Sequence, residues 1–220
     1  MLASVRQNLL KYLAGLTIAS GVGLAFGQLE QVPGELFVEV LTDTDGPDWR
    51  PEDRTRLLQL LSQDQRAMVR VAVGDALAAN PIPRGRGVTD VVQGLVRDQA
   101  PPVHSSGLQA WARCLEATPV VERIQTAAQW ALSEHDAQRH AVAWALAGPM
   151  QLPAADVILT YLASDRAAQI RRTSLESVRK RFESQPELVR SVASLGANDR
   201  SRRVRKLARG MLAELVTAEV

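Results

Sequence analysis

The sequence is poor in the residues that would cross-link a small fold or build a reactive centre. Cys114 is the only cysteine among 220 residues, so an internal disulfide framework is excluded. The histidines are only three, His104, His135 and His140, and the last two lie five positions apart, where an i, i+4 pair would suit a metal. Glycine-rich phosphate loops and nucleophile elbows are also missing. We therefore expect no catalytic residue, no cofactor and no metal ion.

Aromatic residues are scarce, at 4% of the chain, and Tyr161 and Phe182 are the only ones beyond residue 150. A surface that stacks nucleic-acid bases needs aromatic platforms, so such a surface is not supported. Ala, Leu, Val and Arg dominate instead, and the apolar fraction of 46% is ordinary for a soluble globular protein. This composition favours helices over strands, and we expect an all-α fold.

The sequence does contain a pattern that recurs five times. A pair of positions, usually hydrophobic then basic, begins at residues 69, 103, 138, 170 and 204, in steps of 34, 35, 32 and 34 residues. An acid lies six residues before the basic position in four copies, and Ser133 replaces it in the third. The acidic and basic positions are Asp64 and Arg70, Asp98 and His104, Arg139 alone, Asp165 and Arg171, and Asp199 and Arg205. Self-similarity at this period is typical of stacked helical repeats.

Each copy predicts a first helix, a short turn that carries the acid, and a second helix that carries the base. The predicted repeats span about 51–80, 87–117, 119–147, 153–183 and 186–216, in an array over 49–220. The turn acid can cap the second helix, and the base can pair with acids of its own or a neighbouring repeat, which would form a ladder. His104 and Ser133 predict an interruption of this ladder, with Asp136 or Glu134 as a substitute acid.

Residues Pro51 to Val216 resemble the HEAT-repeat family in hairpin length, in prolines near the first helices, and in the turn acid and second-helix base. The resemblance implies an α-solenoid of about five hairpins whose second helices line a concave surface, and binding by that surface rather than catalysis. DNA-alkylation-repair glycosylases are also built from HEAT-like repeats. They are rich in aromatics around a catalytic Asp, and no such cluster stands near the basic end of this chain.

Residues 1–48 lack the repeat and begin with an apolar run, Leu9–Gly27, in which Lys11 is the only charge. Small residues recur at every fourth position of this run: Gly15, Ala19, Gly23 and Gly27. Three interpretations stay open: a membrane anchor with the repeats outside the cytoplasm, a helix capping a soluble cytoplasmic array, or a cleaved secretory signal. Pro33–Asp43 predicts one further amphipathic helix.

The charge of the chain is unevenly distributed. Residues 166–209 carry thirteen Lys and Arg against four acids, a net +9, whereas the remainder has a net charge of −7. Beyond the ladder, the candidate partner-binding residues of this region are Arg172, Arg179, Lys180, Arg181, Arg202, Arg203, Lys206 and Arg209. We predict a non-catalytic scaffold or adaptor that docks an acidic protein. The alternatives are a plain solvated surface, a site for lipid headgroups, and a module that binds nucleic acid without sequence specificity.

Overall fold

The computed structural model describes residues 51–79, 86–147 and 154–218, and every regular element in these ranges is an α-helix. The predicted all-α class is therefore confirmed for the described part of the chain. The apolar run 9–27, the predicted helix 33–43 and the predicted boundary at residue 48 lie outside the described residues. Those predictions stay open.

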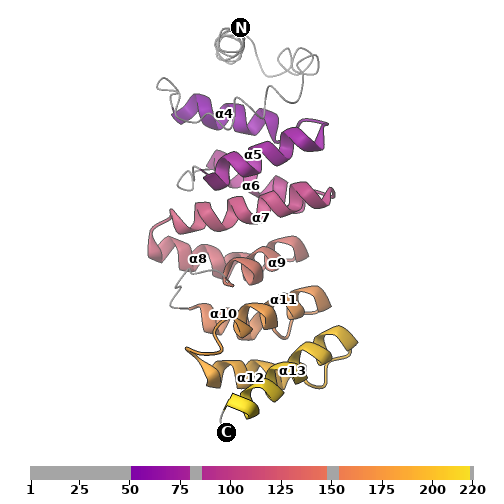
Figure 1. Cartoon of the computed structure of the whole chain (residues 1–220). Helices are drawn as coiled ribbons and strands as arrows, with labels where there is room; N and C mark the ends of the chain where they lie inside the picture. The colour runs from indigo at the N-terminus through magenta and orange to yellow at the C-terminus, as the bar shows by residue number, and fades with distance from the viewer. Residues whose placement is uncertain (1–50, 80–85, 148–153, 219–220) are drawn as a thin grey trace. The chain divides into compact units, whose positions relative to one another are not determined.

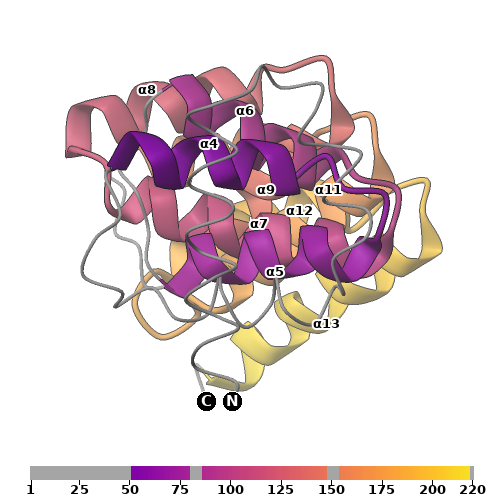
Figure 2. The same cartoon turned by 90° about the horizontal axis from the view of Figure 1, so that it is seen from above.

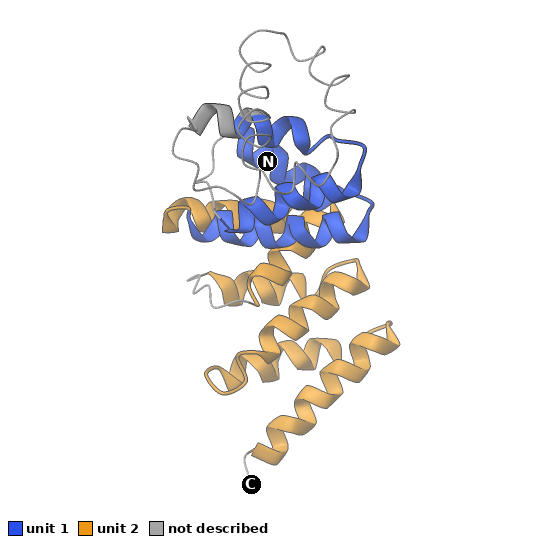
Figure 3. Cartoon of the chain, turned by 45° about the horizontal axis from the view of Figure 1, so that its top comes forward, with its two compact units in different colours: residues 1–117 blue, residues 118–220 orange. Residues whose placement is uncertain are grey.

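The chain divides into two compact units, residues 1–117 and 118–220, which Figure 3 colours separately. The described helices of the first unit are α4 (Pro51–Leu61), α5 (Ala67–Ala79), α6 (Arg86–Arg97) and α7 (Pro101–Glu116). Those of the second are α8 (Val120–Ala131), α9 (Asp136–Ala145), α10 (Ala155–Leu162), α11 (Ala168–Arg179), α12 (Pro186–Gly196) and α13 (Arg202–Ala218).

In the first unit two helix pairs, α4–α5 and α6–α7, pack on each other. The first helices α4 and α6 lie in one row and the second helices α5 and α7 in another, as Figure 2 shows from above. Each helix has one apolar stripe, which it buries against both its pair mate and the next pair. The largest fully buried side chains are Leu58, Leu61, Leu77, Leu95, Trp111 and Leu115. Burying one such side chain contributes about 1.5–3 kcal/mol.

The second unit repeats this arrangement with three helix pairs, α8–α9, α10–α11 and α12–α13, in succession (Figure 1). The second helices pack in order, α9 on α11 and α11 on α13, and α8 packs on α10 among the first helices. The buried side chains that join these layers include Leu146, Leu159, Leu162, Ile170, Leu175, Val178, Val189 and Met211. Both units therefore have a helical repeat-like fold in which the second helices form a continuous layer within each unit.

Two helices begin earlier than the sequence pattern predicts. The second helix of the second repeat begins at Pro101, two residues before the pattern position 103, because proline fits the first turn of a helix, where its missing N–H has no intrahelical partner to lose. Helix α6 begins at Arg86, just before the predicted start of that repeat at about residue 87. Trp111 and Trp130 are buried in the core, whereas the side chain of Trp144, also on a helix with an apolar stripe, is 37% exposed.

Glycine allows a close contact between α6 and α7 in the first unit. A Cβ on Gly107 of α7 would lie 2.7 Å from the carbonyl carbon of Leu95 and 2.8 Å from the amide nitrogen of Val96, both backbone atoms of α6. A Cβ on Gly94 of α6 would meet nothing within 4 Å. The two glycines therefore differ in kind: Gly107 is required by packing, whereas Gly94 is not.

We expect Gly107→Ala to lower the free energy of unfolding by about 1–3 kcal/mol, because α6 and α7 must move apart to admit the methyl group. The matched change Gly94→Ala should raise it by about 0.5–1 kcal/mol, since alanine is the better helix former. Urea denaturation followed by circular dichroism measures both. Equal effects from the two changes would contradict the close packing of α6 on α7.

Candidate functional site

The five turns that precede the second helices share one hydrogen bond. In each, the side chain of the turn residue accepts the backbone N–H two residues later: Asp64 from Arg66 (2.8 Å), Asp98 from Ala100 (2.8 Å), Ser133 from His135 (3.1 Å), Asp165 from Ala167 (2.8 Å) and Asp199 from Ser201 (2.6 Å). The residue that donates this N–H directly precedes the second helix. The side chain thus closes the turn before the helix, rather than capping an N–H inside the first turn as the sequence pattern suggested.

Three arginines join neighbouring repeats through both carboxylate oxygens of the same turn acids. Nε of Arg70, Arg139 and Arg171 donates to Asp98 (2.7 Å), Asp165 (2.6 Å) and Asp199 (2.6 Å), respectively. An NH2 group completes each fork at 3.2, 3.2 and 2.7 Å. Each guanidinium also donates through NH1 to two backbone carbonyls of its own turn. One side chain therefore ties its own turn to the next one along the stack.

These ion pairs are largely withdrawn from water. Arg171 and Asp199 have side chains only 6% and 9% exposed, and Arg139 and Asp165 are each 5% exposed. The Arg70–Asp98 pair in the first unit is somewhat more open, at 17% and 15%. Removing one partner of such a pair leaves a buried charge uncompensated, which is far more costly than losing an exposed pair.

The two residues that depart from the repeat pattern, His104 and Ser133, form hydrogen bonds within their own repeats. Ser133 hydrogen-bonds the Gln138 side chain, and Asp136 accepts from Arg139 within the same repeat (2.6 Å). Glu134 contributes only its backbone carbonyl to Arg139. His104 turns towards its own hairpin, where Nδ1 donates to the carbonyl of Val96 (2.6 Å). Each of the three described ion pairs between a ladder arginine and the next turn acid therefore joins two repeats of the same unit.

The two ends of the pattern also have their own partners. Asp64, in the first copy, forms an ion pair with Arg66 (2.7 Å). Arg205, in the last copy, donates through NH1 to the carbonyl of Asp199 (2.5 Å), as the equivalent ladder arginines do in their own turns. Its turn is thus held by one of the two carbonyl bonds that Arg70, Arg139 and Arg171 form in theirs.

The ion pairs shift the pKa values of the residues that form them. Hydrogen bonds from Arg171 lower the pKa of Asp199 below its usual range, outweighing the opposing effect of burial. Burial alone would raise the pKa of Asp98, but the bonds from Arg70 and the Ala100 amide together bring it below the usual value. The Asp199 carboxylate in turn raises the pKa of Arg171. All three groups are charged at neutral pH.

The eight candidate partner-binding residues fall into two groups. Four are engaged: Arg172 pairs with Glu176 (2.8 Å), Arg179 with Glu214 (2.5 Å) and Arg181 with Asp156, and Arg209 donates to the carbonyl of Ala197 (3.0 Å). The other four, Lys180, Arg202, Arg203 and Lys206, are exposed and have no ion pair or hydrogen bond with any described residue. The free positive charge is therefore concentrated at the beginning of α13.

A groove of about 440 Å³ runs between the second helices α11 and α13. Its charged lining residues are Arg172, Glu176, Arg179, Arg203, Lys206 and Glu214, and Leu207, Gly210 and Met211 complete it. Both acids are held in the ion pairs described above, so Arg203 and Lys206 leave the groove with a net positive charge.

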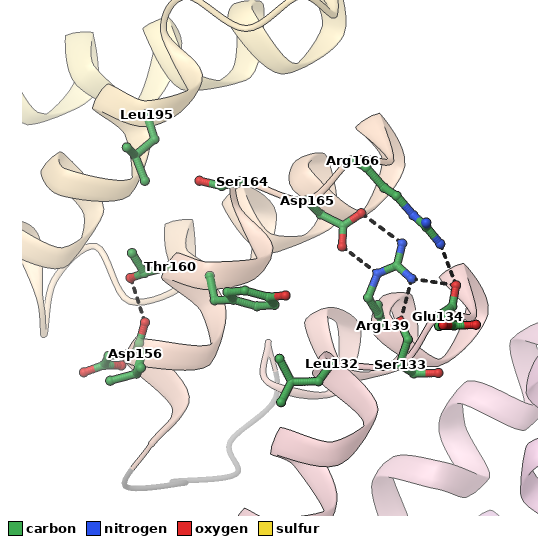
Figure 4. A pocket seen from close by; sticks show the side chains of 12 residues that line it. Leu132, Ser133, Glu134, Arg139, Asp156, Thr160, Ser164, Asp165, Arg166 and Leu195 are labelled. Carbon is green, nitrogen blue, oxygen red and sulfur yellow. Dashed lines mark hydrogen bonds and ion pairs between the residues drawn. The ribbon is translucent and has the colours of Figure 1, made fainter.

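A second, larger groove of about 900 Å³ lies on the first-helix side of the same unit (Figure 4). Four exposed apolar side chains line it: Leu132 (69% exposed), Val157 (73%), Tyr161 (54%) and Leu195 (51%). In Figure 4 the Arg139–Asp165 pair closes one side of it. The sequence pattern did not indicate this groove, because its walls come from α9, α10, α12 and the turns after α8 and α10, and no single helix carries it.

Within the described ranges no group of three or more His, Cys, Asp or Glu side chains could hold a metal ion. Cys114 is buried and unbridged. His140 Nε2 lies 3.2 Å from the hydroxyl of Thr173, and His135 precedes α9, so the structure does not bring these histidines together. None of the helices that the structure describes is long and apolar enough to span a bilayer. The small residues Gly15, Ala19, Gly23 and Gly27 lie outside those helices.

Comparison with known proteins supports the fold class alone. The crystal structure of Cex1p is similar, with a TM-score of 0.57 and 14% sequence identity over 96% of this chain. The chain spans 42% of the length of that structure. At this identity the likeness carries no statement about function. No protein-family model matches the sequence, and no curated protein does.

Adjacent arginines of α11 allow a matched test of the buried pairs. We expect Arg171→Ala to lower the free energy of unfolding by about 3–5 kcal/mol, because the Asp199 carboxylate stays buried without its partner. Arg172→Ala removes only an exposed i, i+4 pair and should cost at most about 0.5 kcal/mol. Urea denaturation of both variants gives the two values. A cost for Arg171→Ala no larger than that for Arg172→Ala would contradict a structural role for the pair.

Acid should weaken the same interaction. Since the pKa of Asp199 is lower in the folded than in the unfolded chain, its contribution is full above the unfolded pKa and is lost as pH falls through the folded one. We therefore expect the difference in unfolding free energy between the wild type and Asp199→Asn to be constant above about pH 5 and to shrink below about pH 4. Denaturation curves over a pH series measure it. A constant difference down to the acid limit would contradict the shift.

Proposed function

We propose that this chain is a non-catalytic HEAT-like α-solenoid that serves as a scaffold or adaptor and docks an acidic partner protein on its basic C-terminal repeats. The observation that carries the proposal is the set of exposed cations at the start of α13, Arg202, Arg203 and Lys206, which have no partner among the described residues. Such a surface attracts acidic partners over distances of about a Debye length, roughly 8–10 Å in physiological salt.

The position of these cations supports a role in binding a partner rather than in stabilising the fold. The N-terminus of a helix carries partial positive charge, so basic side chains in its first turn are unfavourable by about 0.3–1 kcal/mol each. Helix α13 begins at Arg202 and has no acid in its first turn. The first helices α8, α10 and α12 of the same unit each have an acid there, Glu122, Asp156 and Glu187. The second helix α11 also lacks an acid in its first turn, but its first three residues are uncharged, whereas α13 begins with two arginines. A binding partner that brings negative charge would offset this unfavourable arrangement.

A protein partner is favoured over nucleic acid by the chemistry around the cations. Because Glu176 and Glu214 neutralise Arg172 and Arg179, the unpaired positive charge is confined to a short stretch of α13, whereas a continuous phosphate backbone needs cations along its length. The buried side chain of Met211 and the half-buried Leu207 form an apolar floor that suits polypeptide side chains. Helices α11 and α13 contain no aromatic residue on which bases would stack.

Charge reversal tests the proposal. The full-length chain should bind a labelled short peptide rich in glutamate and leucine more tightly than duplex DNA of equal charge at physiological salt, as measured by fluorescence anisotropy. Combining Arg202→Glu, Arg203→Glu and Lys206→Glu should abolish peptide binding. The unfolding free energy should be unchanged or slightly higher, because the first turn of α13 then carries favourable charge.

The matched control reverses three arginines elsewhere, Arg97, Arg113 and Arg190, and so changes the net charge by the same amount. We expect this control to keep most of its affinity for the peptide. Equal losses in the two variants would mean that only net charge matters, and tight binding of duplex DNA alone would support the nucleic-acid alternative. Either result would overturn the proposal.

A further inference from the structure

The groove between α11 and α13 has a feature that the fold does not need. Gly210 lies in the interior of α13, is exposed, and lines the groove. A Cβ placed on it would meet nothing within 4 Å, so no neighbour requires the absence of a side chain. Glycine within a helix lowers the stability of that helix relative to alanine. The open space at Gly210 thus has no structural reason within the described unit.

Other glycines of the chain show what a structural reason looks like. A Cβ on Gly196, at the end of α12, would lie 2.9 Å from the Cβ of Ala208 on α13, and one on Gly107 would meet the backbone of α6. These two positions are closed by packing, whereas the position of Gly210 is open to the groove. Its backbone is therefore free to be approached closely by a bound molecule.

The charges of the groove are graded along its length. The cations Arg172, Arg203 and Lys206 all lie in the first two turns of their helices, α11 and α13. Towards the other end, Arg179 is neutralised by Glu214 at 2.5 Å. Arg203 and Lys206 are three residues apart on one helix, so their side chains emerge about 5–6 Å apart on the same face. Gly210 follows Lys206 by one further turn on that face.

From this arrangement we infer that the α11–α13 groove binds an acidic polypeptide segment, with two carboxylates on Arg203 and Lys206 and an apolar side chain lying directly over Gly210. The charge complementarity identifies the segment as acidic. The apolar floor at Leu207 and Met211, next to the open space at Gly210, identifies the residue that follows the acids as apolar. This inference rests on the proposed function and specifies the partner of that same surface.

An array of short peptides tests the inference with the full-length chain. Two glutamates and one leucine are moved through all relative spacings on a glycine–serine background, and matched arrays replace the glutamates by glutamine or the leucine by serine. We expect a preferred spacing, with binding lost in both matched arrays. Binding that needs the glutamates but not the leucine, or that shows no preferred spacing, would overturn the groove assignment.

The decisive variants are Gly210→Ala and Gly210→Leu, with Gly94→Ala and Gly94→Leu as controls at the other open glycine. Both Gly210 changes should raise resistance to denaturation, and Gly210→Leu should weaken the best peptide by about tenfold or more, because its side chain fills the space over which the peptide lies. The Gly94 changes should leave affinity unaltered. Unaltered affinity in Gly210→Leu would overturn the inference.

The outcomes also separate this inference from the proposed function. If charge reversal at Arg203 and Lys206 abolishes binding while Gly210→Leu does not, the acidic-partner proposal stands and the groove assignment falls. If the peptides survive charge reversal but are lost in a Leu132→Ser, Leu195→Ser variant, binding belongs to the apolar groove of Figure 4 and both fail. Duplex DNA that binds more tightly than every peptide, with no effect of Gly210→Leu, would also overturn both.

Discussion

The bidentate ion pair between a second-helix arginine and the turn aspartate of the next repeat is the interaction on which each unit depends. Arg171 shows the arrangement most fully: two bonds to Asp199 and two to backbone carbonyls of its own turn. Because the aspartate also closes the turn before its own helix, one carboxylate determines both where a second helix begins and how it meets its neighbour. The apolar layers contribute most of the stability, but they are non-directional, and the fork geometry of arginine supplies direction.

The ladder determines which basic side chains remain available to bind a partner. The ladder arginines point into the stack and are saturated, while the arginines beside them pair across the surface or stay free. Helix α13 combines unpaired positive charge at an unfavourable helix end with an open glycine about two turns further along the helix. Each of these features makes the helix less stable than acidic residues in its first turn, or alanine at position 210, would make it. Local departures of this kind from the most stable choice are expected at functional sites.

The helix pairs and the ladder could be predicted because both repeat along the chain. A period of 32–35 residues repeats the apolar stripes and the basic position five times and the turn acid four times, so a departure in one copy does not hide the pattern. The engagement of the candidate cations could not be predicted. Arg181 reaches Asp156, 25 residues away, and that contact depends on how two repeats pack. The exposure of Trp144, the open face of Gly210 and the apolar groove could not be predicted either, because each depends on how several helices pack.

The most direct test of the account is hydrogen–deuterium exchange on the full-length chain with and without the tightest-binding acidic peptide. The account predicts slower exchange over 172–179 of α11 and 203–214 of α13, with no change over α8 and α10. Protection confined to the helices that carry Leu132, Val157 and Tyr161, or no local protection at saturating peptide, would contradict it.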